Sequence, residues 1–183
     1  MARGRPSKKG LIAEAASNLF RVSGYQGTSI DQVVIEAGVS KPTVYSNFPS
    51  KLLLWQEVLM LLIAETEREL DAKTTALKVS ETSFTKGWMA LWEQWVASAD
   101  RIAAYRIHWG ERHKLTDVEH GLFHSLEELL VAHLSAWLNA FELSNANFYA
   151  LVAVSREAYL IPALSKASAL PIDVESEISA LIK

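Results

Sequence analysis

The chain has 183 residues, of which half are apolar, and it carries a formal net charge of −3 and no cysteine. This length suits one large or two small domains, and the apolar fraction is ample for a buried core. The lack of cysteine excludes disulfides and thiol chemistry. Because apolar runs are short, we expect neither a signal peptide nor a membrane-spanning helix.

Positive charge gathers in the N-terminal part of the chain. Residues 1–51 contain seven basic and three acidic residues, a balance of +4, whereas residues 52–183 contain 11 basic and 18 acidic residues, a balance of −7. This asymmetry indicates a basic module joined to an acidic body. We therefore expect two domains, at residues 1–51 and 52–183.

Apolar residues recur at helical spacing along the chain and strand patterns are almost absent, so the sequence predicts an all-α fold. The first amphipathic helix is predicted over about 7–22 and ends at Gly24. Thr28 is expected to cap a short helix over 29–37, with Asp31 three residues on as a variant of the capping box.

A break follows at Gly38, which supplies a backbone turn that most residues would strain. Ser40 is predicted to cap a third, short helix with Pro42 in its first turn, and Phe48-Pro49 ends that helix. A helix, a tight turn and a second short helix in this spacing form a helix-turn-helix unit. The sequence therefore predicts an N-terminal three-helix helix-turn-helix domain.

The rest of the chain is predicted to be a larger helical domain. Ser50 is expected to cap its first helix, which runs towards Leu77. The remaining helices are expected over 83–99, 101–112, 117–141, 144–160 and from 172 onwards.

The start of the short third helix carries a cluster of polar side chains. Helix-turn-helix proteins turn the N-terminal residues of this helix towards DNA base edges. Lys41 can reach a guanine edge or a phosphate, and Thr43 can reach a base edge or a thymine methyl group. The further candidates for DNA contact are Thr28, Ser40, Pro42, Tyr45, Ser46, Asn47 and Lys51. The cluster thus predicts a DNA-contacting surface, and an ordinary solvated loop is the alternative.

A set of residues around this unit follows a family pattern. The set comprises Gly24-Tyr25-Gln26-Gly27-Thr28-Ser29-Ile30, Val33 to Ser40, Thr43-Val44-Tyr45, Phe48, and Ser50-Lys51 with Leu54. It resembles the N-terminal domain of the TetR family of bacterial transcription repressors. Two positions depart from the family: Val34 stands where Ala is frequent, and Asn47 where His or Tyr is frequent. The resemblance implies a cytoplasmic DNA-binding protein, found at the nucleoid when bound, without enzymatic activity or cofactor.

The stretch Arg-Gly-Arg-Pro at residues 3–6 resembles the arms of minor-groove binders. In such arms, arginine enters a narrow A·T-rich groove. We therefore include Arg3 and Arg5 among the DNA-contact candidates. A solvated tail is the alternative, and the two interpretations agree if the arm orders only on DNA.

Tryptophans dominate one face of the helix predicted over 83–99. Trp88, Trp92 and Trp95 lie at i, i+4 and i+7, and Tyr105 and Trp109 are expected to converge on the same region. Such an aromatic stripe is also common in an ordinary hydrophobic core that binds no ligand. Because the TetR resemblance implies a small ligand within the helical body, we take these five residues as pocket candidates. Their aromatic character favours a hydrophobic effector, aromatic or cationic.

The five histidines offer only a weak metal pattern. His120 and His124 share a helix face at i, i+4, whereas the side chains of His108 and His113, five residues apart, point about 140° apart. The sequence supplies no third or fourth ligand for a metal. We therefore expect partly exposed or core histidines rather than a metal site.

The helices over 117–141 and 144–160 carry more apolar residues than one buried face needs. The apolar rows are Leu122, Leu126, Leu129, Leu130, Leu134, Trp137, Phe148, Leu151, Val152 and Tyr159, with His133 and Ser155 among them. The family resemblance implies that these helices pair with those of a second subunit in a four-helix dimer seam. A core within one chain is the alternative.

The sequence thus predicts a ligand-responsive transcriptional repressor that binds a palindromic operator as a dimer and is released by a small hydrophobic effector. A ligand-dependent activator fits the same residues, because geometry sets the sign of the coupling. A small-molecule-binding helical protein or an enzyme with an incidental helix-turn-helix is the third alternative. We find no nucleophile–base pair, glycine-rich phosphate loop or acidic dyad to support an enzyme.

Overall fold

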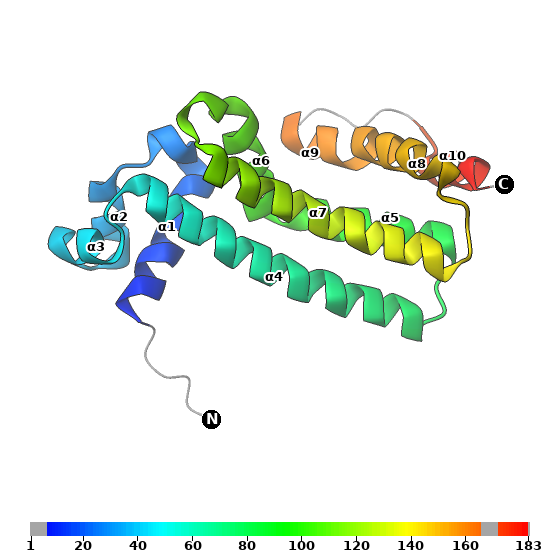
Figure 1. Cartoon of the computed structure of the whole chain (residues 1–183), viewed down its shortest axis with the longest axis horizontal. Coiled ribbons are helices and arrows are strands. Elements are labelled where there is room, and N and C mark those ends of the chain that lie inside the picture. Colours follow the sequence, from blue (N-terminus) through cyan, green and yellow to red (C-terminus); the bar gives the residue numbers. More distant parts are fainter. Residues whose placement is uncertain (1–6, 166–171, 183) are drawn as a thin grey trace. The chain divides into compact units, whose positions relative to one another are not determined.

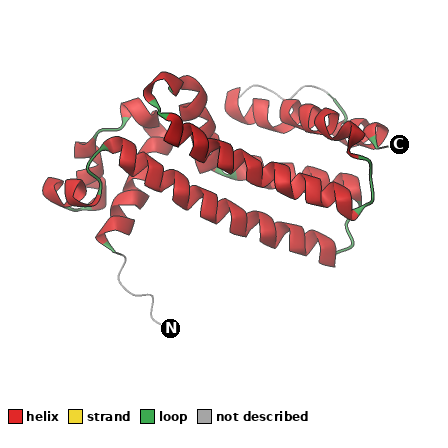
Figure 2. Ribbon diagram, in the orientation of Figure 1, coloured by secondary structure: helices red, strands yellow, loops and turns green. Residues whose placement is uncertain are grey.

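The computed structural model describes residues 7–165 and 172–182, and these form helices without a strand (Figures 1 and 2). The first elements are α1 (Lys8–Gly27), α2 (Ile30–Ala37), α3 (Lys41–Asn47), α4 (Lys51–Val79), α5 (Phe84–Ala97) and α6 (Ala99–Gly110). The later elements are η1 (Arg112–Lys114), α7 (Asp117–Ala140), η2 (Asn145–Asn147), α8 (Phe148–Ser155), η3 (Arg156–Leu160), α9 (Ile161–Ser165) and α10 (Val174–Leu181). The predicted all-α fold is confirmed.

The chain divides into two compact units. Unit 1 comprises residues 1–63 and 103–124, and unit 2 comprises residues 64–102 and 125–183. The divisions fall inside α4, α6 and α7. The segment 103–124, which the charge pattern assigned to the acidic body, is therefore grouped with the N-terminal helices.

In unit 1, α1, α2 and α3 pack around a small apolar core (Figure 1). Ile12 and Phe20 from α1, Val33 from α2 and Val44 from α3 are fully or almost fully buried. The ring of Phe20 meets Trp55 of α4 edge-on, with 5.0 Å between ring centroids. This core fixes α2 and α3 against α1, and helices as short as these two would not be stable alone in water.

Two local predictions in unit 1 need correction. The predicted first helix ended at about residue 22, but α1 runs to Gly27 with a break at Gly24, where φ is 72° and ψ is −179°. Thr28 does not cap α2. Ser29 does, because its hydroxyl accepts the N–H of Gln32 while the Gln32 side chain accepts the N–H of Ser29, which forms a capping box. The predicted partner Asp31 takes no part in this capping box.

In unit 2, the core is built from aromatic and leucine side chains of α5 and α7. Trp88 and Trp95 of α5 and Leu134 of α7 are completely buried. Helices α5 and α7 approach so closely at Gly87 that a Cβ there would collide with the indole of Trp137. That indole is fixed in turn by its N–H, which donates to the Phe84 carbonyl at 3.0 Å.

The helix predicted over 144–160 is interrupted and longer than expected. It begins with the 3-10 turn η2, passes through the π-helical turn η3, and continues through α9 to Ser165. The N–H of Ile161 donates to the Arg156 carbonyl five residues back, as a π turn requires. Pro162 lacks an N–H, and the wide turn before it lets the helix continue past the predicted end at residue 160.

Among the helices of the described residues, none combines the length and the apolar character that crossing a bilayer requires.

Candidate nucleic-acid interface

The turn between α2 and α3 depends on one glycine. Gly38 adopts φ 62° and ψ 34°, and its N–H donates to the carbonyls of Ile35 and Val34. The N–H of Val39 also donates to the Val34 carbonyl, at 3.3 Å. This left-handed cap is favourable for glycine and ends α2 abruptly, so α3 starts in a new direction.

The N-terminal turn of α3 is exposed and internally ordered. The Ser40 hydroxyl accepts the N–H of Thr43 at 3.3 Å, as the predicted cap requires, and the two hydroxyl oxygens are 2.8 Å apart. Pro42 occupies the first turn, where its missing N–H leaves nothing unpaired. The remaining N–H groups and the short polar side chains therefore face solvent at one end of a rigid helix.

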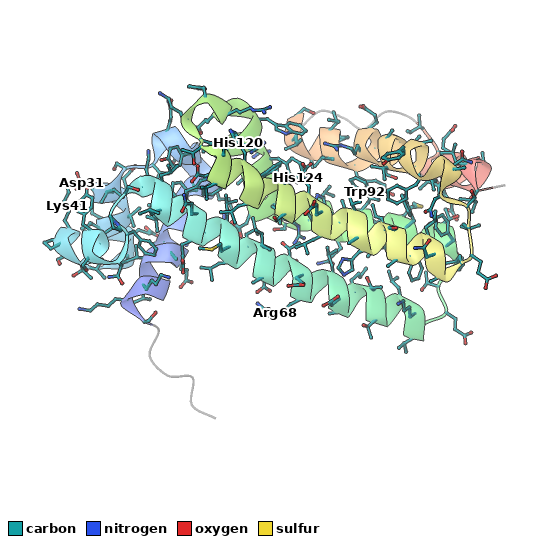
Figure 3. The ribbon with its side chains drawn as sticks, viewed as in Figure 1. Asp31, Lys41, Arg68, Trp92, His120 and His124 are labelled. Atoms are coloured by element: carbon teal, nitrogen blue, oxygen red, sulfur yellow. The ribbon has the colours of Figure 1, made fainter. Side chains whose placement is uncertain are left out.

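Lys41, the strongest predicted base or phosphate contact, forms an ion pair with Asp31 of α2. Its Nζ lies 2.7 Å from a carboxylate oxygen of Asp31, and both side chains are exposed (Figure 3). This hydrogen bond is the largest cause that raises the pKa of Lys41. The ammonium is therefore charged at neutral pH and lies at the surface.

The C-terminal half of α3 presents one aromatic side chain. Tyr45 is 44% exposed. By contrast, the hydroxyl of Ser46 and the side-chain amide of Asn47 both donate to the Thr43 carbonyl, at 2.9 and 2.8 Å. Asn47 is half-buried.

Thr28 and Lys51, also predicted contacts, bond within unit 1. Thr28 is 1% exposed and its hydroxyl donates to the Gly24 carbonyl at 2.8 Å. The Lys51 ammonium donates to the carbonyls of Tyr25 and Thr28 at 2.8 and 2.9 Å and lies over the Tyr25 ring. Burial lowers the pKa of Lys51. Arg3 and Arg5 lie outside the described residues.

The predicted pocket residues divide between the two units. Trp88, Trp92 and Trp95 belong to unit 2 and are 0, 2 and 0% exposed, whereas Tyr105 and Trp109 belong to unit 1. Within unit 1 the rings of Tyr105 and Trp109 meet edge-on at 5.4 Å, and Trp109 is 48% exposed.

The tryptophans of unit 2 contact α8 and the π turn η3. The indole N–H of Trp88 donates to the Ser155 hydroxyl at 2.9 Å, and the ring of Trp92 stacks on Tyr159. Burial, helped by the charge of Glu93, raises the pKa of Tyr159 to about 12. The indole N–H of Trp92 is buried without an acceptor among the described residues. Two cavities of unit 2 are lined by other residues, including Leu151 in one and Glu157 in the other.

Half of the apolar residues predicted for a dimer seam are buried within the chain. Leu126, Leu134 and Leu151 are completely buried, as is Ser155. The same helices also expose large apolar side chains, namely Val131, Phe141 and Tyr149.

Two half-buried histidines of unit 1 form a pair. His108 and His120 meet edge-on with 5.0 Å between ring centroids, and His108 stacks on Phe123 at 3.9 Å. Burial, with the charges of His120 and Arg112, lowers the pKa of His108 to about 4. Within residues 7–165 and 172–182, no three His, Asp or Glu side chains gather so that they could hold a metal ion.

Sequence reasoning missed three buried or half-buried charged residues. Arg101 is 1% exposed, and its guanidinium donates to the Gln94 and Trp95 carbonyls at the end of α5. Glu119 accepts hydrogen bonds from Thr116 and from the side-chain amide of Gln56. Burial opposes ionisation of Glu119, but these hydrogen bonds outweigh it and lower its pKa. The third residue, Glu111, accepts two backbone N–H groups from the end of α1.

The geometry of unit 1 agrees with comparisons to known proteins. Residues 12–58 match the family model described as bacterial regulatory proteins, tetR family. The chain is 42% identical over 55 residues to the HTH-type transcriptional activator FasR of Mycolicibacterium smegmatis, a match that covers 30% of the chain and 25% of FasR. A match of 29% identity over 135 residues covers 73% of the chain and 46% of YuxN of Bacillus subtilis, an uncharacterized HTH-type transcriptional regulator. The chain thus spans between a quarter and just under half of the length of these relatives.

Solved structures share the fold over nearly the whole chain. One, of a protein of Mesorhizobium loti proposed to be a TetR-family transcriptional regulator, gives a TM-score of 0.70 at 20% identity and covers 96% of this chain and 93% of that one. Another, of a protein of Vibrio parahaemolyticus with the same proposed assignment, gives 0.67 at 21% identity and covers 96% of each chain. The curated relatives in these comparisons are named as transcriptional regulators. The match of residues 12–58 to the family model and the curated relatives support a TetR-family transcriptional regulator.

Proposed function

We propose that the chain is a ligand-responsive transcriptional repressor that binds a palindromic DNA operator as a dimer and is released by a small hydrophobic effector. Residues 1–51 would contact DNA, and residues 52–183 would bind the effector and the second subunit. The observation that carries the proposal is the exposed N-terminal turn of α3, which presents Lys41 and short hydroxyl side chains at the surface.

The proposed DNA contacts follow from reach and chemistry. Lys41 exchanges the Asp31 carboxylate for a phosphate or a guanine edge, and Thr43 reads a base edge. Tyr45, with Ser40, Pro42, Ser46 and Asn47, completes the surface of α3. Lys51 uses two of its three ammonium N–H groups on backbone carbonyls, and the third is directed to a phosphate. Thr28, whose side chain is buried, contributes through the N-terminal end of α2, and Arg3 and Arg5 enter the minor groove.

The proposed dimer supplies the affinity that one short helix lacks. A single recognition helix buries little surface, and two helices about one DNA turn apart, roughly 34 Å, read two half-sites together. We assign the subunit contact to the helices over 117–141 and 144–160, through faces that one chain leaves exposed, such as those of Val131 and Tyr149.

The proposed effector contacts are Trp88, Trp92 and Trp95, with Tyr105 and Trp109 as contributors from unit 1. Because the three indoles of unit 2 are buried, an effector that reaches them must open their packing. Ligand binding then favours a second arrangement of the helices, and a ligand can shift the equilibrium only by its preference for that arrangement. The buried, unpaired N–H of Trp92 offers such a ligand a hydrogen bond.

Selection of bound duplexes from a random DNA pool tests the proposal. We expect a palindrome whose half-sites lie about one helical turn apart. In gel-shift assays with the selected duplex, Lys41→Ala and Tyr45→Phe should each weaken binding while the dimer stays intact. Recovery of no preferred sequence, or unchanged affinity of both variants, would refute the assignment.

A ligand-dependent activator is a second candidate, because the relative FasR is named a transcriptional activator. That match is confined to 55 residues, and the sign of regulation depends on the rest of the protein. A reporter gene downstream of the selected duplex separates the two, since a repressor lowers expression and an activator raises it. In either role the protein would act in the bacterial cytoplasm, at the nucleoid while bound.

A further inference from the structure

Residues 24–28 comprise the last turn of α1, after the break at Gly24, and the residue that follows it. At Gly24 the backbone leaves the helical conformation, with φ 72° and ψ −179°. N–H groups that follow such a break have no carbonyl one turn behind them. We call residues 24–28 the α1–α2 connector.

A carboxylate from far along the chain satisfies these groups. Glu111 Oε1 accepts the N–H of Tyr25 at 3.0 Å, and Oε2 accepts the N–H of Gln26 at 2.7 Å. Ionised acceptors make hydrogen bonds about twice as strong as neutral ones, and the positive end of a short helical turn favours them further. The positive φ at Gly24 favours glycine, and a Cβ there would lie 2.9 Å from Oε1, so a side chain at this position would push the Glu111 carboxylate aside.

A cation holds the carbonyl groups of the same connector. Lys51, the first residue of α4, donates to the carbonyls of Tyr25 and Thr28, and the Thr28 hydroxyl donates to the Gly24 carbonyl. The charge of Glu111 partly offsets the effect of burial on the pKa of Lys51. The connector is thus held between an anion that accepts its N–H groups and a cation that binds its carbonyls.

The connector determines where α2 and α3 sit on α1. It leads into the Ser29 capping box, and the turn at Gly38 and the Ser40 cap fix α3 relative to α2. The two helices therefore follow the connector together. Without Glu111, the N–H groups of Tyr25 and Gln26 would turn towards water and the connector could adopt other directions.

We propose that Glu111 is a positioning residue for DNA recognition: by fixing the α1–α2 connector it sets the orientation of α3, so operator affinity depends on a residue that does not touch DNA. This inference rests on the proposed function, because it assumes that α3 enters DNA. It extends the DNA-binding machinery beyond the N-terminal residues to the segment that follows α6.

The experiment uses the full chain and the duplex that the wild-type protein selects from a random pool. Glu111→Ala should weaken affinity for that duplex about tenfold, because both charge-assisted hydrogen bonds are lost. Glu111→Gln should weaken it only about threefold, since its amide oxygen can still accept one N–H. The control Glu67→Gln removes the same charge from an exposed site on α4 and should stay within about twofold of wild type.

A second readout separates positioning from general stability. Amide hydrogen exchange should accelerate at Tyr25 and Gln26 in Glu111→Ala, while the amides of Val33 and Val44 in the core keep their protection. A smaller loss of affinity in Glu111→Gln than in Glu111→Ala, together with faster exchange at Tyr25 and Gln26, supports the proposal. Should Glu111→Ala fail to fold, the threefold loss in folded Glu111→Gln carries the test.

Wild-type affinity in folded Glu111→Ala or Glu111→Gln would overturn the positioning role and leave the proposed function standing. Equal losses in Glu111→Gln and Glu67→Gln would also overturn it, because net charge would then explain both. If the wild-type chain selects no duplex, the proposed function itself fails, and this inference fails with it.

Discussion

Lys41 and Asp31 form an exposed ion pair, 2.7 Å between Nζ and the carboxylate oxygen, at the surface that we assign to DNA. The pair joins the start of α3 to the first turn of α2. In the proposed complex, the Asp31 carboxylate and a phosphate would compete for the Lys41 ammonium, so the carboxylate should weaken DNA binding.

Asp31→Asn should therefore strengthen duplex binding. Exposed ion pairs are weak, and the expected gain is roughly two- to fivefold in affinity, measured by fluorescence anisotropy with the selected duplex. Glu36→Gln removes a charge from an exposed site on the same helix and is the control. An equal gain in the control would mean that general repulsion, rather than release of Lys41, explains the effect.

The contact between α5 and α7 at Gly87 should tolerate no side chain. Gly87→Ala forces a methyl group into the fixed indole of Trp137 and should lower the free energy of unfolding by about 1–3 kcal/mol. Gly121→Ala in α7 meets no atom within 4 Å and should raise it by about 0.5–1 kcal/mol. Urea denaturation measures both, and a neutral Gly87→Ala would contradict the packing.

Arg101 should be the most sensitive charged residue of unit 2. Its guanidinium bonds to Thr66, Glu69 and two carbonyls of α5, and the planar group is almost fully buried. Arg101→Lys retains the charge but cannot match four directed bonds, and it should cost about 2–4 kcal/mol of unfolding free energy. Glu69→Gln keeps an acceptor at a partly exposed site and should cost about 1 kcal/mol or less. Equal costs would show that Arg101 acts only as the partner of Glu69.

Stability should fall on acidification because of His108. The pKa of His108 is lowered to about 4 in the folded chain, so between pH 6.5 and about 4 the unfolded chain binds the proton first. The free energy of unfolding then decreases by at most about 1.4 kcal/mol per pH unit, and above pH 6.5 the residue contributes no pH dependence. His108→Gln should flatten this part of the curve, whereas His113→Gln, at an exposed site, should not. Identical curves for all three proteins would contradict the lowered pKa of His108.

Periodicity and turn chemistry predicted the all-α fold and the helix-turn-helix, because Gly38, Ser40 and Pro42 act through neighbours in sequence. The predicted cap at Thr28 was wrong because two adjacent hydroxyl residues are equivalent in sequence, and only packing decides that Thr28 is buried. Contacts such as that of Glu111 with Tyr25 join residues 86 positions apart, and no local pattern encodes them. The π turn before Pro162 likewise lacked a signal in the sequence, so the helix was predicted to end at residue 160.

The central claim, that the N-terminal turn of α3 binds DNA through Lys41, is tested most directly by the salt dependence of affinity for the selected duplex. The logarithm of the association constant should fall steeply and linearly with the logarithm of salt concentration for the wild-type chain. In Lys41→Ala, the slope should shrink by about one phosphate contact, together with a loss of affinity. Lys41→Ala with the wild-type slope and affinity would contradict the claim.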